Sequence, residues 1–170
     1  MKRIVAVFIT LGIWVLFNSS CTVKLSGAST VGLKTINVAY FENNSPLVVN
    51  YLSQQFTEAL KDRIRSTTSL AIVQGEADAT MSGSITNYTI EPISVQATNN
   101  TTPPLAGAER LTITINVTYT NSVDKKNNFT QSFPAYADFK GDIANQEQAL
   151  ITTIIKQLTE DIFNRAFANW

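Results

Sequence analysis

The spacing of hydrophobic residues changes early in the chain. From 34 to 41 apolar residues alternate with polar or small ones, and Ile36, Val38 and Tyr40 share one parity. A period of two is typical of a half-buried β-strand. Ser45 and Pro46 then favour a helix start, because a capping hydroxyl is followed by proline at the first helical position. The residues beyond repeat every four positions on one face of a helix predicted to end near 65–66: Val48, Leu52, Phe56, Leu60 and Ile64.

Two more strands are predicted next. The short apolar run 70–73 suits a short strand, and a turn at 74–78 separates it from a long strand over 79–95. Within the long strand the apolar positions change parity between Ile85 and Tyr88. Such a change of phase predicts a β-bulge, in which one strand of a pair carries an extra residue.

The most regular alternation lies over 111–119. Its odd positions are apolar, and its even positions are threonine or asparagine. A polar loop at 121–128 follows and leads into another alternating stretch that begins at Phe129. These patterns predict a meander of three long antiparallel strands, with one apolar face and one face rich in threonine.

The C-terminal part returns to a helical period. Asn145 is a candidate cap, and Gln148 is placed for the reciprocal bond. Phe163, Phe167 and Trp170 project roughly opposite the predicted buried stripe. We expect either that these rings form a contact surface for a partner or membrane, or that the last turn folds them back onto the sheet. The buried stripe itself is predicted to contain Leu150, Ile151, Ile154, Ile155, Leu158 and Ile162.

The N-terminus has the pattern of a secretory signal peptide. Two basic residues precede the apolar run 4–17, and small polar residues lead from it to Cys21. The run is shorter than the roughly 20 apolar residues that a membrane-spanning helix needs. Cys21 is the single cysteine, so it has no partner for an intramolecular disulfide. We interpret it as the lipidated cysteine of a bacterial lipoprotein, acylated for instance with palmitate, and the alternative is a free thiol.

This interpretation divides the chain into three parts. Residues 1–20 are the expected signal peptide, 21–32 are a lipidated tether, and 33–170 form one domain of ordinary size.

The composition argues against several classes of function. Histidine is absent, and with it the commonest general base and metal ligand. A lone cysteine cannot build a zinc site, and no phosphate-binding glycine loop or nucleophile elbow occurs. We therefore expect no enzyme activity, no cofactor and no metal. Removing the two basic residues of the signal peptide leaves 11 of the 13 Lys and Arg against 13 Asp and Glu, which gives no electrostatic reason to expect nucleic acid.

Three cations cluster in the last turns of the first predicted helix: Lys61, Arg63 and Arg65. They suit either the phosphate of an anionic lipid or the negative end of the helix dipole.

Together these elements predict an α+β fold. We expect a mixed, mostly antiparallel four-stranded sheet with two helices packed on one face, in the order β-α-β-β-β-β-α with one strand short. The chain resembles the lipopolysaccharide-assembly lipoprotein family, LptE, in its Bacteroidetes-like form. The main stretches that carry the resemblance follow in order over nearly all of the chain after the cysteine: 38–41, 43–47, 56–62, 83–88, 110–114, 136–139, 161–164 and 168–170.

The resemblance implies a function and partners. Members of the family look like plugs inside the lumen of an LptD-type outer-membrane β-barrel, whose assembly they assist, and they help to deliver lipopolysaccharide to the outer leaflet. For this chain the resemblance implies a lipid-anchored protein of the outer membrane. No acidic run follows Cys21, which favours the periplasmic leaflet over the cell surface. The alternative is a periplasmic lipoprotein that scaffolds or activates another envelope protein.

Candidate contact residues follow from the same comparison. Basic residues near loop tips are thought to touch lipopolysaccharide in some members, which makes Lys125 and Lys126 candidate contacts with lipopolysaccharide or the barrel by loop position. Phe163, Phe167 and Trp170 are the aromatic candidates.

Overall fold

The computed structural model describes residues 30–93 and 107–168. The expected signal peptide, Cys21, most of the tether and Trp170 lie outside these residues. In chain order the elements are β1 (Thr35–Val38), β2 (Glu42–Asn43), α2 (Leu52–Thr67), β3 (Ala71–Ile72), β4 (Ala79–Ile93), β5 (Ala108–Asn121), the 3₁₀ turn η1 (Lys125–Asn127), β6 (Phe129–Lys140), the 3₁₀ turn η2 (Ile143–Asn145) and α3 (Glu147–Phe167).

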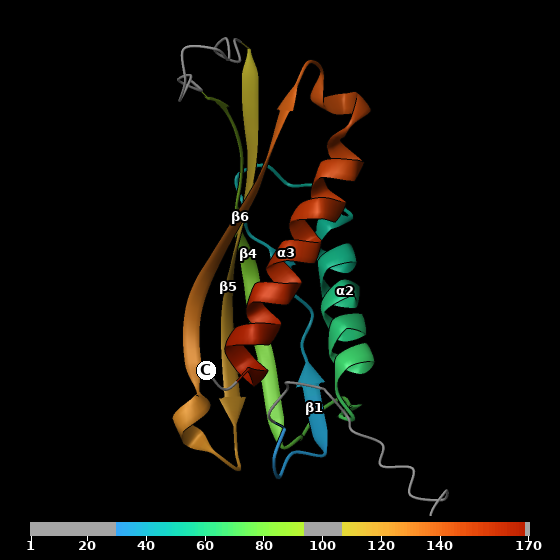
Figure 1. Ribbon diagram of the computed structural model, residues 1–170. Helices are drawn as coiled ribbons and strands as arrows, with labels where there is room; N and C mark the ends of the chain where they lie inside the picture. Colours follow the sequence, from blue (N-terminus) through green and yellow to red (C-terminus); the bar gives the residue numbers. More distant parts are fainter. Residues whose placement is uncertain (1–29, 94–106, 169–170) are drawn as a thin grey trace, which may run out of the picture.

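The strands form one mixed sheet in the order β3-β1-β4-β5-β6, and β2 also pairs with β4. The pairs of β1 and β2 are parallel, whereas β4, β5 and β6 form an antiparallel meander. Figure 1 shows this meander as a long twisted sheet. The predicted α+β class and meander are confirmed. The sheet has six strands where four were predicted, because two-residue strands such as β2 are too short to show an alternation.

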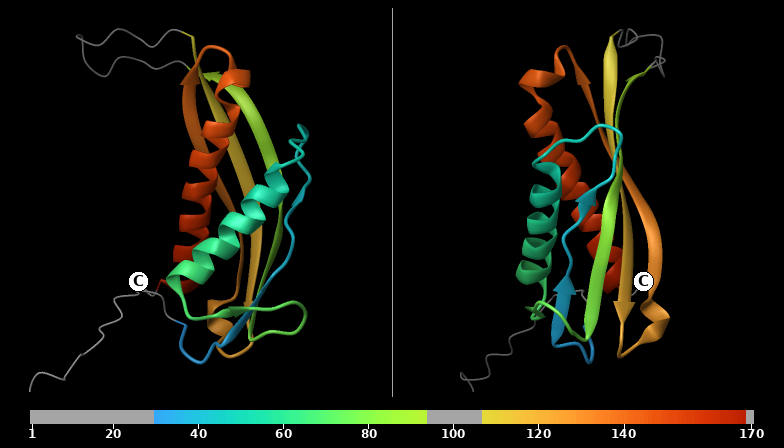
Figure 2. Two further views of the ribbon diagram at one scale, coloured as in Figure 1. Left: turned by 90° about the vertical axis from the view of Figure 1, so that its right-hand side faces the viewer. Right: turned by 180° about the vertical axis from the view of Figure 1, so that it is seen from behind.

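Both helices lie against the same face of the sheet, as predicted (Figure 2). Their apolar faces and the apolar face of the sheet share one core, in which most of the predicted helix residues have no exposed surface. The other face of the sheet is uncovered by any described element.

Helix α2 begins later than the sequence predicts. Tyr51 is its N-cap and makes no side-chain capping bond, whereas Ser45 lies in the connection before it. The Ser45 hydroxyl donates to the carbonyl oxygen of Leu47 at 2.6 Å, so it closes a local turn instead of a helix. Val48, predicted on the buried helix face, is consequently exposed. The helix ends at Thr67, close to the predicted position.

Phe41 takes the core position that the alternation assigns to Tyr40. Tyr40 is exposed, while the Phe41 ring is fully buried and packs edge-on against Phe56 at 5.0 Å between ring centroids. The ring occupies the space over Gly83 in β4, where a Cβ atom would lie 2.8 Å from Phe41 Cε1 and 2.0 Å from the carbonyl oxygen of Asn116. Gly83 therefore lets β5 and the Phe41 ring, which follows β1, pack closely against β4.

The predicted bulge in β4 is confirmed. The pairing with β5 shifts register between Ile85 and Asn87. Ile85 and Tyr88 both point into the core as a result, although they differ in parity.

Helix α3 begins without the predicted capping box. Asn145 lies in η2, and Gln146 is the N-cap, with no side-chain capping bond. The predicted stripe is otherwise correct, since five of its members are buried and Leu150 is partly buried.

Candidate functional site

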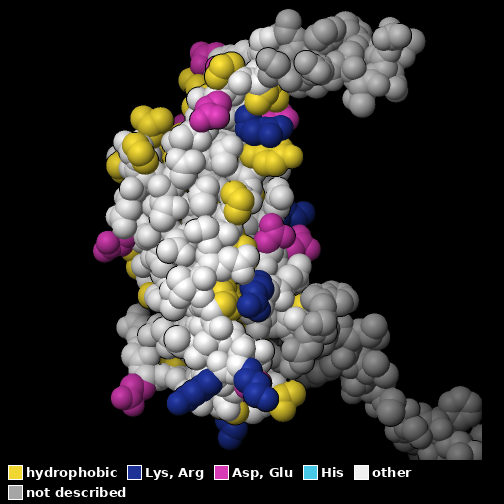
Figure 3. Space-filling model, turned by 90° about the vertical axis from the view of Figure 1, so that its left-hand side faces the viewer, with side chains coloured by type: hydrophobic (Ala, Val, Ile, Leu, Met, Phe, Trp, Pro, Cys, Tyr) yellow, Lys and Arg dark blue, Asp and Glu magenta, His cyan; other side chains and the backbone are white. Residues whose placement is uncertain are grey.

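The uncovered face of the sheet carries short, neutral, polar side chains, and we call it the open face. Figure 3 shows it as a broad neutral surface, with charged side chains gathered at its margins and ends. The strand register arranges these residues in rows, such as Ser82, Thr118 and Thr130. They comprise Thr80, Ser82, Ser84, Asn87 and Thr89 of β4, Thr112, Thr114, Asn116, Thr118 and Thr120 of β5, and Thr130 and Ser132 of β6.

The chemistry of the open face suits a large polar contact. Hydroxyl and amide groups donate and accept hydrogen bonds, and burying them costs little when each finds a partner. Thr118 and Thr130 already share a hydrogen bond of 3.0 Å across β5 and β6. The sequence indicated this surface through the even positions of 111–119.

One charged cluster stands at the end of the open face distant from η1. Arg110 donates to Asp138 through two bonds, from Nε at 2.6 Å and from Nη2 at 2.9 Å. Its guanidinium also lies 3.8 Å from the ring centroid of Tyr136, which is half exposed. The hydrogen bonds from Arg110 lower the pKa of Asp138. The pair is therefore ionised and oriented across β5 and β6.

A polar cluster fastens the two helices to the sheet. The Tyr88 hydroxyl donates to Glu147 Oε1 at 2.7 Å, and the Tyr51 hydroxyl donates to the other carboxylate oxygen at 3.5 Å. Burial raises the pKa of Tyr88, and the hydrogen bond to Glu147 raises it further. This cluster joins β4 to the first turns of α2 and α3.

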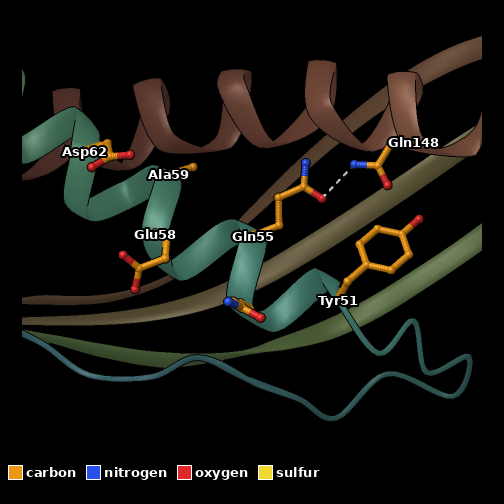
Figure 4. A pocket seen from close by; sticks show the side chains of 7 residues that line it. Tyr51, Gln55, Glu58, Ala59, Asp62 and Gln148 are labelled. Carbon is orange, nitrogen blue, oxygen red and sulfur yellow. Dashed lines mark hydrogen bonds between the residues drawn. The ribbon is translucent and has the colours of Figure 1, made fainter.

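A shallow groove of about 500 Å³ runs between α2 and α3 on the side away from the sheet. Figure 4 shows its polar lining, in which Gln148 Nε2 donates to Gln55 Oε1 at 3.2 Å. Its acids, Glu58 and Asp62, pair with cations of the same helix. No cluster of three potential metal-ligating side chains occurs within residues 30–93 and 107–168.

The cation cluster predicted in α2 is engaged within the protein. Lys61 pairs with Glu58 and Arg65 with Asp62 on the same helix. Arg63 reaches Glu160 of α3 at 3.6 Å and lies over the ring of Phe163. These contacts favour a role in helix packing over a phosphate site.

The aromatic candidates in α3 do not form an exposed surface. Phe163 and Phe167 are 4% and 1% exposed, and Phe167 packs edge-on against Tyr119 of β5 at 5.7 Å. The expected contact surface is wrong for these two rings, because the last turns of α3 lie over the end of the sheet. The alternative is right that these two rings are buried, but the last turn does not fold back, since α3 remains helical through Phe167. Trp170 lies outside the described residues.

The structure places Lys125 and Lys126 in η1, at the tip of the β5–β6 hairpin, and both are exposed. Asp124 caps the turn by accepting from the backbone N–H of Lys126 at 3.1 Å. The two lysine side chains form no ion pair in the part of the chain that is described. They are thus free for an anionic partner.

Four large apolar side chains near the start of α2 are exposed, which the sequence did not predict, and we call them the exposed apolar corner. It consists of Tyr40, Leu47, Val48 and Tyr51, which surround the connection into α2. The corner arises from the late start of the helix, and the spacing of apolar residues gave no signal of it.

None of the helices in residues 30–93 and 107–168 is both long and apolar enough to cross a membrane.

Comparison with known proteins identifies the family. A family model described as LptE, lipopolysaccharide-assembly, matches residues 33–166. Comparison with the curated proteins gives no match.

Solved structures with the same fold include lipoproteins. A protein from Xanthomonas campestris is 12% identical with a TM-score of 0.53, over 76% of this chain and 81% of that one. Lipoprotein B from Nitrosomonas europaea is 10% identical with a TM-score of 0.51, over 77% and 80%. The hypothetical protein CT253 from Chlamydia trachomatis is 9% identical with a TM-score of 0.50, over 81% and 99%. At these identities the likeness shows the fold alone.

Proposed function

The chain belongs to the LptE, lipopolysaccharide-assembly, family, and on that premise we propose that it is an outer-membrane lipoprotein that plugs an LptD-type β-barrel. It would assist assembly of the barrel and transport of lipopolysaccharide to the outer leaflet. Acyl chains on Cys21 would hold it at the periplasmic leaflet, and residues 22–32 would link them to the domain.

The observation that carries this proposal is the neutral open face. A protein that enters a barrel lumen must contact a curved wall of polar side chains over a large area. Rows of threonine and serine can form many hydrogen bonds to such a wall without removing charges from water. Ordinary surfaces carry more charge, and only 15% of this chain is charged.

The family is one of transport lipoproteins, which supports a role without catalysis. The histidine-free composition points the same way. We accordingly propose a structural role, with binding surfaces in place of reacting groups.

Lys125 and Lys126 would contact an anionic group of lipopolysaccharide or of the barrel. Two observations support this contact: both lysine side chains are exposed, and neither forms an ion pair within the described part of the chain.

The alternative of an envelope scaffold has one observation in its favour, the exposed apolar corner. A scaffold was expected to bind its partner through an exposed aromatic patch at Phe163, but that ring is buried. The barrel plug therefore explains more of the surface.

Copurification tests the proposal. The tagged protein is extracted from its own membranes in detergent, washed stringently, and its partners are identified by mass spectrometry. We expect one large outer-membrane β-barrel in near-equal amount. Recovery of the lipoprotein alone, or with cell-wall enzymes, would support the scaffold.

A further inference from the structure

The end of the domain that carries η1 is also the end at which the chain enters from the tether. We call it the tether end and define it by residues 30–35, 74–78 and 121–128. Figure 1 shows β1 and the β5–β6 hairpin together at the lower end of the molecule. A Cβ atom on Gly32 would lie 2.9 Å from Val123 Cγ1, so the two segments are in direct contact.

Hydrogen bonds hold these segments together. The backbone N–H of Lys34 donates to Asp78 Oδ2 at 2.8 Å, and the Ser122 hydroxyl donates to the Asp78 carbonyl oxygen at 2.6 Å. Backbone and hydroxyl donors of Lys34 and Thr35 lower the pKa of Asp78. The tether end is therefore a rigid part of the fold and not a set of separate loops.

Its distance from the lipid anchor is limited by the chain. The nine residue-to-residue steps from Cys21 to Thr30 span at most about 30 Å when fully extended. The 15 residues of β4 extend for about 50 Å, which is longer than that reach. The tether end is consequently held within about 30 Å of the leaflet that holds the acyl chains, whereas the opposite end of the sheet can extend beyond that distance.

The tether end exposes two apolar side chains, Val31 at 86% and Val123 at 54%. The same segments carry three exposed lysines, and none is in an ion pair within the described residues: Lys34, Lys125 and Lys126.

Two of the acids of the tether end, unlike its lysines, are held by hydrogen bonds within the fold. The Asp78 carboxylate accepts from the backbone N–H groups of Lys34 and Thr35, and the Asp124 carboxylate accepts from that of Lys126. Only Glu76, among the acids of these segments, is without such a bond. The ammonium groups are thus freer to reach outward than the carboxylates.

Exposed apolar side chains in segments that also carry exposed lysines match the boundary between acyl chains and phosphate groups at a membrane surface. From this combination we infer that the tether end rests on the leaflet that carries the anchor, with Val31 and Val123 at the headgroup boundary and Lys34, Lys125 and Lys126 directed to phospholipid phosphates. This inference rests on the proposed lipidation of Cys21. It assigns the two hairpin lysines to anionic phospholipid while no barrel is bound, and in the complex with the barrel the same ammonium groups are the proposed contacts with lipopolysaccharide or the barrel.

Fluorescence quenching in barrel-free vesicles tests the inference. The full lipidated chain, with Trp170→Phe in every variant, is reconstituted into phosphatidylethanolamine and phosphatidylglycerol whose acyl chains carry bromine. Val123→Trp places the probe at the tether end. Leu47→Trp is the matched control, because Leu47 is 55% exposed and lies in the connection before α2, outside the tether end. We expect several-fold stronger quenching at position 123 than at position 47.

The lysines are tested in the Val123→Trp background. In one orientation the tether end contacts the leaflet, and in the other it does not. The double substitution Lys125→Gln and Lys126→Gln should shift the equilibrium between them about 25-fold towards the orientation without contact, at about fivefold per lysine. Lys140→Gln is the control, since Lys140 is exposed and lies at the opposite end of β6. Thermal unfolding checks that each variant is folded. Equal quenching at positions 123 and 47, or unchanged quenching in the double lysine variant, would overturn the inference.

The outcome is distinguishable from that of the barrel experiment. An unmodified Cys21 in the intact mass would overturn the lipid anchor and this inference together. With Cys21 acylated, absence of quenching refutes only the membrane contact, because no barrel is present in the vesicles. Failure to copurify a barrel, conversely, leaves the quenching result unchanged.

Discussion

Replacing Gly83 by alanine tests how closely β5 and the Phe41 ring must approach β4. The new Cβ atom would lie 2.0 Å from the carbonyl oxygen of Asn116 and 2.8 Å from Phe41 Cε1, where ordinary contact begins near 3.4 Å. The carbonyl belongs to the backbone of β5, so a change of rotamer cannot relieve the overlap. The strands must separate, or the Phe41 ring must leave its place against Phe56.

The expected cost follows from two opposing effects. Overpacking a core costs about 1–3 kcal/mol, and a backbone overlap belongs at the upper end. Alanine restricts the unfolded chain, which offsets about 0.4–1 kcal/mol. We therefore expect a net loss of about 2 kcal/mol in the free energy of unfolding for Gly83→Ala.

Urea unfolding followed by circular dichroism measures this loss. With a slope of about 1–3 kcal/mol per molar urea, the midpoint should fall by about 1 M. Gly75→Ala is the matched control: its φ is +86° and nothing lies within 4 Å of the new Cβ. It should cost about 1 kcal/mol through backbone strain alone. If Gly83→Ala were as stable as the parent, or more stable than Gly75→Ala, the proposed close packing would be wrong.

Three further predictions concern the open face and the polar clusters. Thr114→Arg places an unpaired charge at the centre of the open face, so it should abolish copurification of the barrel while the melting temperature stays unchanged; full recovery of the barrel would contradict the proposed interface. Tyr88 keeps its proton in the folded state at pH values where the unfolded chain loses it, so the free energy of unfolding should fall as pH rises above about 10. Tyr88→Phe should flatten that fall in urea unfolding at pH values on either side of 10, and an unaltered slope would show that other groups cause it. Arg110→Ala breaks an exposed pair with Asp138 and should leave the melting temperature nearly unchanged in calorimetry, whereas a large drop would mean that the pair supports the sheet.

Side-chain periodicity was sufficient to predict the long elements. In β5 every odd position from Leu111 to Tyr119 is buried, and in α2 the spacing from Leu52 to Ile64 matches the buried face. These stretches are long enough for several repeats of the period, so that burial alone decides their structure. The bulge in β4 was predictable for the same reason, because the change of parity separates two clear alternations.

Helix ends and short connections were not predictable from such patterns. Ser45 and Pro46 have the composition of a helix start, but the preceding segment pairs with β4 through β2 and delays the helix to Leu52. The serine hydroxyl then bonds within its own turn. A cap contributes only about 1 kcal/mol, so the pairing of β2 and the burial of Phe41 together can override it.

The candidate site was predicted in part. The threonine-rich face is visible in the alternation, whereas the contact between Gly32 and Val123 joins residues far apart in sequence and depends on the sheet topology. The sequence left the burial of Phe163 undecided, because a helical projection treats α3 as isolated. In the structure β5 and β6 extend beneath its last turns and bury a second side of it.

The central claim is that the open face meets a barrel wall, and site-specific photo-crosslinking in the native bacterium tests it most directly. A benzophenone amino acid replaces Thr114 on the open face, and in a second strain it replaces Gln54, which lines the groove on the side of the helices away from the sheet. We expect an abundant adduct from position 114 that contains an outer-membrane β-barrel. An adduct with that barrel from position 54 and none from position 114 would show that the barrel binds the helices and not the open face.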